Sequence, residues 1–154
     1  GKYTATVDMI SLSNEQTLFA TFEGFLEKDG VSSDDAELIV DDAGRRRIRF
    51  SEAFLFDTQS SRFHPKVIPT LDRLAATLRA LGRPVVIEGH TDQAKGQESN
   101  FLLSASRAQS VLRYLATAGE LPERDLTALG FADGRPVDTG EGHSRNRRVE
   151  IVVN

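Results

Sequence analysis

The stretch that decides the fold is PVVIEGHTDQAKGQESNFLLSASRAQSVL, residues 84–112. Its first six residues, Pro84 to Gly89, form a short and mostly apolar stretch, which is typical of a buried β-strand. A polar turn follows, and residues 99–118 then carry apolar side chains at helical spacing until Gly119 ends the pattern. The side chains expected on the buried face of this helix are Leu102, Leu103, Ala108, Val111, Leu112 and Leu115. A strand that leads through a short loop into a helix predicts an α/β domain.

The flanking segments supply the remaining elements of such a domain. A helix is predicted from Pro65 to about Leu81, with Pro69 in its first turn, where a missing N–H costs little. Further strands are predicted at residues 37–40, 47–51, 125–130 and 147–153. Asp42-Ala43-Gly44 has turn chemistry and predicts a β-hairpin from the first two of them. We therefore expect a βαβαβ sandwich with a mixed sheet and helices packed on one face, plus an N-terminal helix and hairpin.

The first 36 residues form an extension ahead of the main domain, which we place at residues 37–154. Ser13 can cap a helix here, and Lys28-Asp29-Gly30 can end it. Its apolar stripe is rich in phenylalanine, with Phe19, Phe22 and Phe25. Such a stripe must be buried either against the parent domain or against a partner chain.

The composition of the chain argues against several classes of protein. At 154 residues it has the size of one domain with a proper core. The net charge of -4 disfavours a nucleic-acid partner, which normally requires a concentrated basic face. Basic residues do cluster at 45–47 and 145–148, and we interpret both clusters as solvated strand edges rather than a polyanion site. The absence of cysteine excludes disulfides and thiolate metal sites.

No apolar run approaches the ~20 residues that a membrane-spanning helix needs. The chain begins with Gly1 rather than methionine, and no signal peptide is visible. We therefore expect that a targeting or membrane segment of the parent protein lies outside this sequence.

Two opposite charges stand at the positions where an α/β domain usually binds ligands. Asp92 follows the end of the strand at residues 84–89, and Arg107 lies two turns into the next helix. The crevice beyond strand ends is the usual ligand site of such sheets. An amino-acid head group would complement the pair, because Arg clamps a carboxylate and Asp pairs with an ammonium. On spacing alone, a plain structural ion pair is the alternative.

Three separated motifs give the chain a resemblance to a known family. They are Gly89-x-Thr91-Asp92; Asn100-x-x-Leu103-Ser104-x-x-Arg107-Ala108-x-x-Val111; and Asn146-Arg147-Arg148-Val149-Glu150-Ile151. Phe56-Asp57 and the partly matched turn from Gly130 to Pro136 add to them. In this order the motifs resemble the OmpA-like peptidoglycan-binding domain, shared by outer-membrane porin tails, the Pal lipoprotein and the flagellar stator protein MotB. The resemblance covers about residues 45–154.

The resemblance implies a site for diaminopimelate in the peptide stem of Gram-negative peptidoglycan. By position, Asp92 pairs with its ammonium group and Arg107 with its carboxylate. The resemblance gives Asn100 and Leu103 the role of shaping the pocket, and Thr91 that of bracing the turn. Phe56-Asp57 would present backbone N–H groups, and Arg147 would lie near the mouth.

The resemblance also implies the setting of the protein. The expected function is a non-catalytic, cofactor-free and metal-free cell-wall anchor in the periplasm. Because the N-terminal extension is similar to that of MotB-like stator proteins, we expect a homodimer. Its parent would be tethered to the inner membrane, less readily to the outer, beside a membrane-embedded partner subunit. The output of that complex stays open.

Other interpretations of the same residues stay open at this point. Asn100 could cap the helix, Leu103 could be ordinary core, and the N-terminal helix could cover the site. A wall hydrolase would need a nucleophile, a zinc motif or a carboxylate pair that the sequence does not display. His64, His90 and His143 have no evident metal-binding companions. A dimerisation or assembly domain with a vestigial pocket is the alternative function.

Overall fold

The computed structural model describes the backbone of residues 2–91, 97–131 and 147–154, and side chains from residue 14 onward except 92–100 and 132–146. The helices and strands are α1 (Lys2–Lys28), β1 (Ala36–Val40), β2 (Arg46–Ser51), α2 (Glu52–Leu55), α3 (Ile68–Leu81), β3 (Val85–His90), α4 (Gln97–Ala116), β4 (Leu126–Gly130) and β5 (Arg148–Val153). Short 3-10 helices occupy Pro65–Val67 and Glu123–Asp125. Among the described helices, none has the length and apolarity to cross a bilayer.

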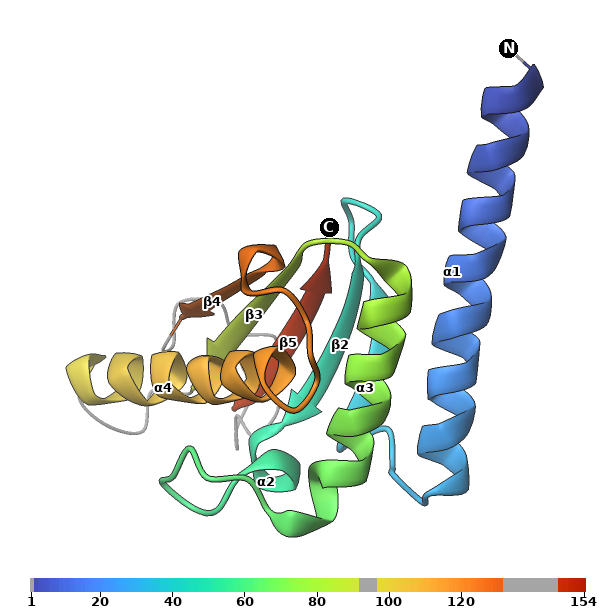
Figure 1. The fold of residues 1–154 in the computed structure, drawn as a ribbon. Helices are drawn as coiled ribbons and strands as arrows, with labels where there is room; N and C mark the ends of the chain where they lie inside the picture. Colours follow the sequence, from blue (N-terminus) through green and yellow to red (C-terminus); the bar gives the residue numbers. More distant parts are fainter. Residues whose placement is uncertain (1, 92–96, 132–146) are drawn as a thin grey trace.

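The five strands form one mixed sheet in the order β1-β2-β5-β3-β4. Neighbouring strands run antiparallel except β3 and β4, which are parallel because the α4 crossover connects them. Helices α3 and α4 lie across one face of the sheet, and α1 stands beside α3 (Figure 1). The predicted mixed sheet, with its hairpin and its helices on one face, is confirmed.

Local sequence explains where the elements turn. The β1–β2 hairpin closes through Asp41, whose Oδ1 accepts from the N–H groups of Ala43 and Arg45 at 3.0 and 2.9 Å. Gly44 has a φ of +79°, which favours glycine. Helix α3 has proline in its first turn, as predicted, and ends at Gly82 in the left-handed conformation.

Two expectations about helices were wrong. Helix α1 begins at Lys2 rather than at Ser13, so Ser13 lies inside the helix and does not cap it. The sequence predicted no helix between residues 51 and 65, but Ser51 caps the short helix α2 by accepting from the N–H of Phe54. A four-residue helix is too short to give a periodic pattern in the sequence.

Helix α1 is part of the hydrophobic core. Phe19 and Phe22 are each only 2% exposed and Leu26 4%, all within the cluster formed by the sheet, α3 and α4. Phe25 lies under the guanidinium of Arg73 on α3, 4.9 Å from ring centroid to Cζ. Docking on the parent domain is therefore the correct choice between the two interpretations of the stripe.

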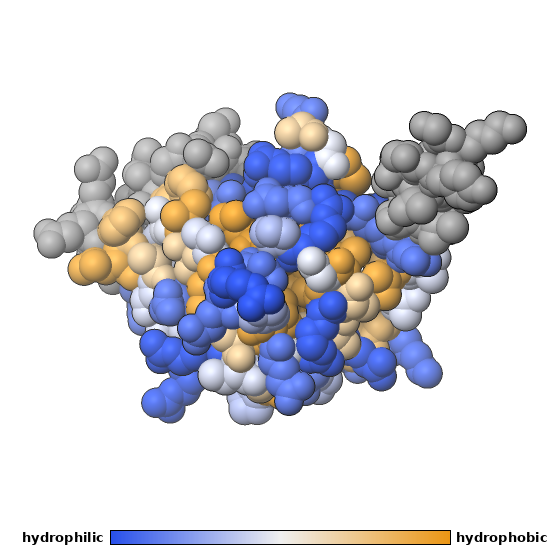
Figure 2. All heavy atoms as spheres, turned by 45° about the horizontal axis from the view of Figure 1, so that its top comes forward, coloured by the Kyte–Doolittle hydropathy of each residue, from blue (hydrophilic) through white to orange (hydrophobic). Residues whose placement is uncertain are grey.

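On the face of the molecule drawn in Figure 2, apolar side chains lie in separate patches between hydrophilic residues. Leu102 is 61% exposed, so its predicted place on the buried side of α4 is wrong. The neighbouring Leu103 is half-buried.

Candidate functional site

Close backbone packing seats α4 on the sheet and thereby positions Arg107. A Cβ on Gly89 of β3 would lie 2.0 Å from the carbonyl oxygen of Ser104, and one on Gly130 of β4 would lie 2.7 Å from the nitrogen of Ala105. Only glycine allows this approach. One turn of helix further on, Arg107 is 2% exposed, so its cation sits inside the protein.

The loop after α2 holds the guanidinium of Arg107. Its Nε donates to the carbonyl oxygen of Ser60 at 2.9 Å, and its Cζ lies 5.3 Å from the ring centroid of Phe56. The neighbouring Ser106 Oγ donates to Ser61 Oγ at 3.1 Å. These contacts attach the loop to the first half of α4.

Glu52 supplies the negative charge for this buried cation. Its Oε1 lies 2.8 Å from Arg107 Nη2, and its Oε2 lies 3.2 Å from Arg147 Nε. Nη2 makes no aligned hydrogen bond with the described residues, so it retains donor capacity. The Glu52 carboxylate is thus shared between two guanidinium groups.

Sequence reasoning missed Glu52. A signal was present, because Ser51-Glu52 places a capping residue and an acid at the start of a helix. The sequence did not show that helix α2 begins at this position, so the role of Glu52 could not be inferred from it. We call Glu52, Phe56, Ser60, Arg107 and Arg147 the Arg107 cluster.

The backbone groups expected from Phe56-Asp57 already have acceptors. The N–H of Phe56 donates to the carbonyl of Glu52 at 2.9 Å, and that of Asp57 donates to the carbonyl of Arg62 at 3.1 Å. The Asp57 carboxylate instead pairs with His64, with Oδ1 2.9 Å from Nδ1. The loop therefore contributes a ring and a carbonyl to the cluster rather than two free donors.

The other predicted site residues differ in their position and in how much of each residue the structure describes. Thr91, just after β3, is 5% exposed, and its buried hydroxyl has no hydrogen-bond partner among the described residues. Asn100 lies inside α4, which begins at Gln97, so the interpretation as a helix cap is wrong. The side chain of Asn100 and the whole of Asp92 lie outside the described residues.

A second charged cluster lies on the sheet face opposite to α3 and α4. Arg47 Nη1 lies 3.1 Å from Glu88 Oε1 and 3.3 Å from Glu150 Oε1, and Arg148 also pairs with Glu150. His90 Nε2 lies 3.1 Å from Glu88 Oε1. Arg47 and Arg148 are therefore enclosed ion-pair partners, and their interpretation as solvated strand edges was wrong.

This second cluster is poorly suited to a metal ion. Ligand atoms of Glu88, His90 and Glu150 lie within 4.8 Å of one another, as a metal site requires. However, Arg47, Arg49 and Arg148 already neutralise these carboxylates and would repel a cation. The arrangement is best described as a buried ion-pair network.

Burial and charge shift the pKa values in this network in consistent directions. Burial lowers the pKa of His90, although its hydrogen bond to Glu88 acts in the opposite sense. Burial alone would raise the pKa of Glu150, but Arg148 and Arg49 outweigh it, and the pKa lies below its usual range. At neutral pH the network thus contains ionised carboxylates and a neutral imidazole.

The fold and the Arg107 cluster together define a small α/β module of a known kind. The chain belongs to the OmpA family, whose sequence pattern matches residues 55–150. It is 36% identical to the peptidoglycan-associated lipoprotein of Pseudomonas aeruginosa, over 80% of this chain and 68% of that protein. The chain spans only 45% of the first relative it matches, a protein of Bacillus subtilis.

Solved structures agree with this assignment. A putative MotB-like protein from Desulfovibrio vulgaris has a TM-score of 0.77 at 22% identity, with 96% of this chain and 95% of that chain covered. The cell wall anchor of the T6SS from Pseudomonas aeruginosa has a TM-score of 0.70 at 34% identity, with 84% and 93% covered. The first comparison shows the fold. The second shows a similar fold in a protein whose sequence is closer to that of this chain.

Proposed function

We propose that this chain is a non-catalytic module that anchors its parent protein to the cell wall by gripping diaminopimelate of the peptide stem. The observation that carries the proposal is the buried guanidinium of Arg107, whose Nη2 lies 2.8 Å from the Glu52 carboxylate and makes no aligned hydrogen bond with the described residues. Membership of the OmpA family supports it, as do relatives named peptidoglycan-associated lipoprotein and cell wall anchor.

The charges of the cluster suit a ligand carboxylate. Glu52 lies against both Arg107 and Arg147, so a ligand carboxylate at Arg107 would meet a guanidinium that the protein already holds in place. A carboxylate that binds a guanidinium away from water gains more than an exposed pair does. Arg147, more exposed than Arg107, would assist from the mouth.

The remaining site residues complete the proposed contacts with diaminopimelate. Asp92 would bind its ammonium, Asn100 and Leu103 would shape the walls, and Thr91 would brace the turn after β3. The Phe56 ring would hold the guanidinium of Arg107 through its cation–π contact. Asp57 would hold the loop through its contact with His64.

The wider setting is part of the same proposal. The parent protein would present this module in the periplasm from an inner-membrane tether, within a stator-like complex that includes a membrane-embedded subunit. The fold that the chain shares with a MotB-like protein agrees with this setting. The homodimer is proposed together with it. The aromatic stripe of α1 no longer argues for dimerisation, because it is buried within its own domain.

One observation favours the alternative of an assembly domain with a vestigial site. Arg107 is almost completely buried and already binds the carbonyl of Ser60, which is what a purely structural arginine would do. The two functions differ in whether a carboxylate ligand reaches Nη2.

Co-sedimentation with purified Gram-negative sacculi distinguishes them. We expect wild-type protein to sediment with the wall, and Asp92→Asn and Arg107→Lys to stay in the supernatant while keeping the wild-type circular dichroism spectrum. Free meso-diaminopimelate should compete, whereas Nα-acetyl-lysine amide should not, because it keeps a side-chain ammonium but has no carboxylate for Arg107 to bind. Folded wild-type protein that fails to sediment, or equal competition by Nα-acetyl-lysine amide, would contradict the proposed grip. Soluble fragments released from the sacculi would instead indicate a hydrolase.

A further inference from the structure

The strand β1 ends the sheet with an unpaired edge. Its hydrogen bonds to β2 use odd-numbered residues, since Ser51 N–H donates to Asp35 and Asp41 N–H donates to Arg45, each at 2.9 Å. In an antiparallel pair the alternate residues point their N–H and C=O groups away from the partner strand. Leu38 and Val40 therefore direct their backbone groups outward, and the described residues place no further strand beside them. An edge of this kind is a template for another strand.

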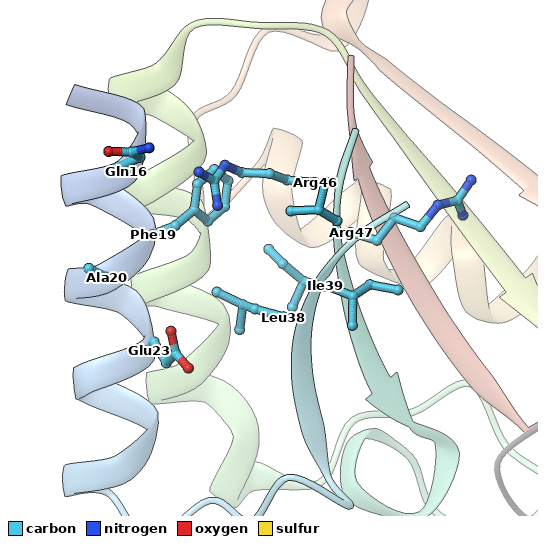
Figure 3. Close-up of a pocket in the computed structure, with 10 residues that line it drawn as sticks. Gln16, Phe19, Ala20, Glu23, Leu38, Ile39, Arg46 and Arg47 are labelled. Carbon is cyan, nitrogen blue, oxygen red and sulfur yellow. The ribbon is translucent and has the colours of Figure 1, made fainter. Parts of the chain in front are cut away.

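A groove runs along this edge between β1 and α1 (Figure 3). Its volume is about 250 Å³. It is lined by Gln16, Phe19, Ala20 and Glu23 from α1, and by Leu38, Ile39, Val40, Arg46, Arg47 and Ile48 from the hairpin. Val40 is 61% exposed, which is unusual for a large apolar side chain in a strand. A helix wall beside an open strand edge is the geometry in which domains bind peptides by strand addition.

The charged side chains of the groove differ in whether they have a partner of opposite charge. Arg46 lies over the Phe19 ring, 4.9 Å from its centroid, and its Nε is 3.6 Å from the carboxylate of Glu15. Arg47 is bound to acidic groups on the other face. Glu23 is exposed, has no ion pair with the described residues, and lies toward the Leu38 end of the groove (Figure 3). Within the groove, Glu23 is therefore the charged side chain without an ion-pair partner among the described residues.

We infer that this groove binds an extended peptide segment of a partner protein, which adds to β1 as a sixth strand. Its residue opposite Leu38 would exchange two backbone hydrogen bonds, and alternate apolar side chains would enter the groove. A basic residue would meet Glu23. The exposed Glu23 in the groove favours a basic peptide over another copy of this chain, which carries a net charge of -4. The site is independent of the proposed wall-binding site, which lies on the other side of α3.

The test uses a displayed library of ten-residue peptides, selected on the whole chain. Enriched peptides should alternate apolar residues and carry one lysine or arginine. When bound, they should slow the hydrogen exchange of the Leu38 and Val40 amides on the order of tenfold or more. Leu38→Pro should abolish binding, because it removes an outward N–H and leaves the ladder to β2 intact.

A charge reversal provides the matched control. Glu23→Lys should weaken binding of the basic peptides at least about tenfold and shift the selection toward acidic ones. Glu27→Lys makes the same charge change on the same helix outside the groove and should leave binding as in the wild type. Selection without enrichment, or peptides that bind Leu38→Pro equally well, would overturn the inference. Protection of Leu38 and Val40 in the protein alone, together with a dimer in sedimentation, would assign the edge to a second copy instead.

Discussion

At the scale of the residue, Glu52 is the group on which the geometry of Arg107 depends. Its two oxygens face Arg107 at 2.8 Å and Arg147 at 3.2 Å, but the two pairs differ in environment. The Arg107 side chain is 2% exposed, whereas that of Arg147 is 39% exposed. A buried cation depends strongly on its counterion, while an exposed one is solvated by water.

Glu52→Gln should therefore lower the free energy of unfolding by about 2–4 kcal/mol, because it leaves the Arg107 charge buried without its partner. Arg147→Gln should cost less than about 1 kcal/mol. Urea denaturation of both variants gives the two values. Equal losses would mean that Glu52 does not serve mainly as the counterion of Arg107.

His90 makes the stability of the protein depend on pH. Burial lowers its folded-state pKa below the usual 6.5, so the folded protein binds fewer protons than the unfolded chain as the pH falls below that value. Acid therefore favours unfolding in this range. Glu88 and Glu150 act in the same sense at lower pH, because their pKa values lie below the usual 4.5.

We expect the wild type to lose stability between pH 7 and pH 5 with a slope of up to about 1.4 kcal/mol per pH unit. His90→Phe keeps a ring that can stack on Phe131 but cannot titrate, so its slope over this range should be shallower. Thermal unfolding at a series of pH values measures both slopes. Parallel curves would show that another group is responsible.

At the scale of the element, the contact between α4 and β3 decides where the first half of α4 lies. The atom that a Cβ on Gly89 would meet is a backbone oxygen, which cannot turn aside as a flexible side chain can. A substitution there must move the helix or the strand.

Gly89→Ala should destabilise the fold by at least about 2 kcal/mol and should weaken wall binding, because Arg107 moves with α4. Gly24→Ala is the matched control, since a Cβ on Gly24 of α1 meets nothing within 4 Å. That change should stabilise the protein by about 0.5–1 kcal/mol through the helix propensity of alanine. Chemical denaturation and co-sedimentation of both variants test the contrast.

At the scale of the whole molecule, α1 is a structural layer rather than a cover over the wall-binding site. It packs on α3 on the side away from α4 (Figure 1). Its side chains Phe19 and Phe22 complete the core. The idea that this helix covers the site is therefore not supported by the arrangement of the described elements.

Phe22→Ala should lower the free energy of unfolding by about 3 kcal/mol or more, while the protein that remains folded should bind sacculi as the wild type does. Phe25→Ala, at a partly exposed position on the same helix, should cost distinctly less. Denaturation and co-sedimentation at a temperature where both variants are folded provide the comparison. An increase in wall binding by Phe22→Ala would restore the covering hypothesis.

The sequence by itself determined the elements whose signals are local. Apolar periodicity predicted α3 and α4, and turn chemistry predicted the β1–β2 hairpin, because each depends on neighbouring residues. The motif around Arg107 indicated where the candidate site lies, and the family assignment confirmed the resemblance. Even so, the sequence did not reveal α2 or the early start of α1, which have weak periodic signals.

Only the tertiary structure decided which groups meet. The pairing of Glu52 with Arg107, 55 residues apart in the sequence, follows from how the loop after β2 folds onto α4. The enclosure of Arg47 and Arg148 among acidic groups, and the groove beside β1, likewise depend on strand order. The physical reason is that burial and ion pairing are properties of contacts between distant segments, which no local pattern of residues encodes.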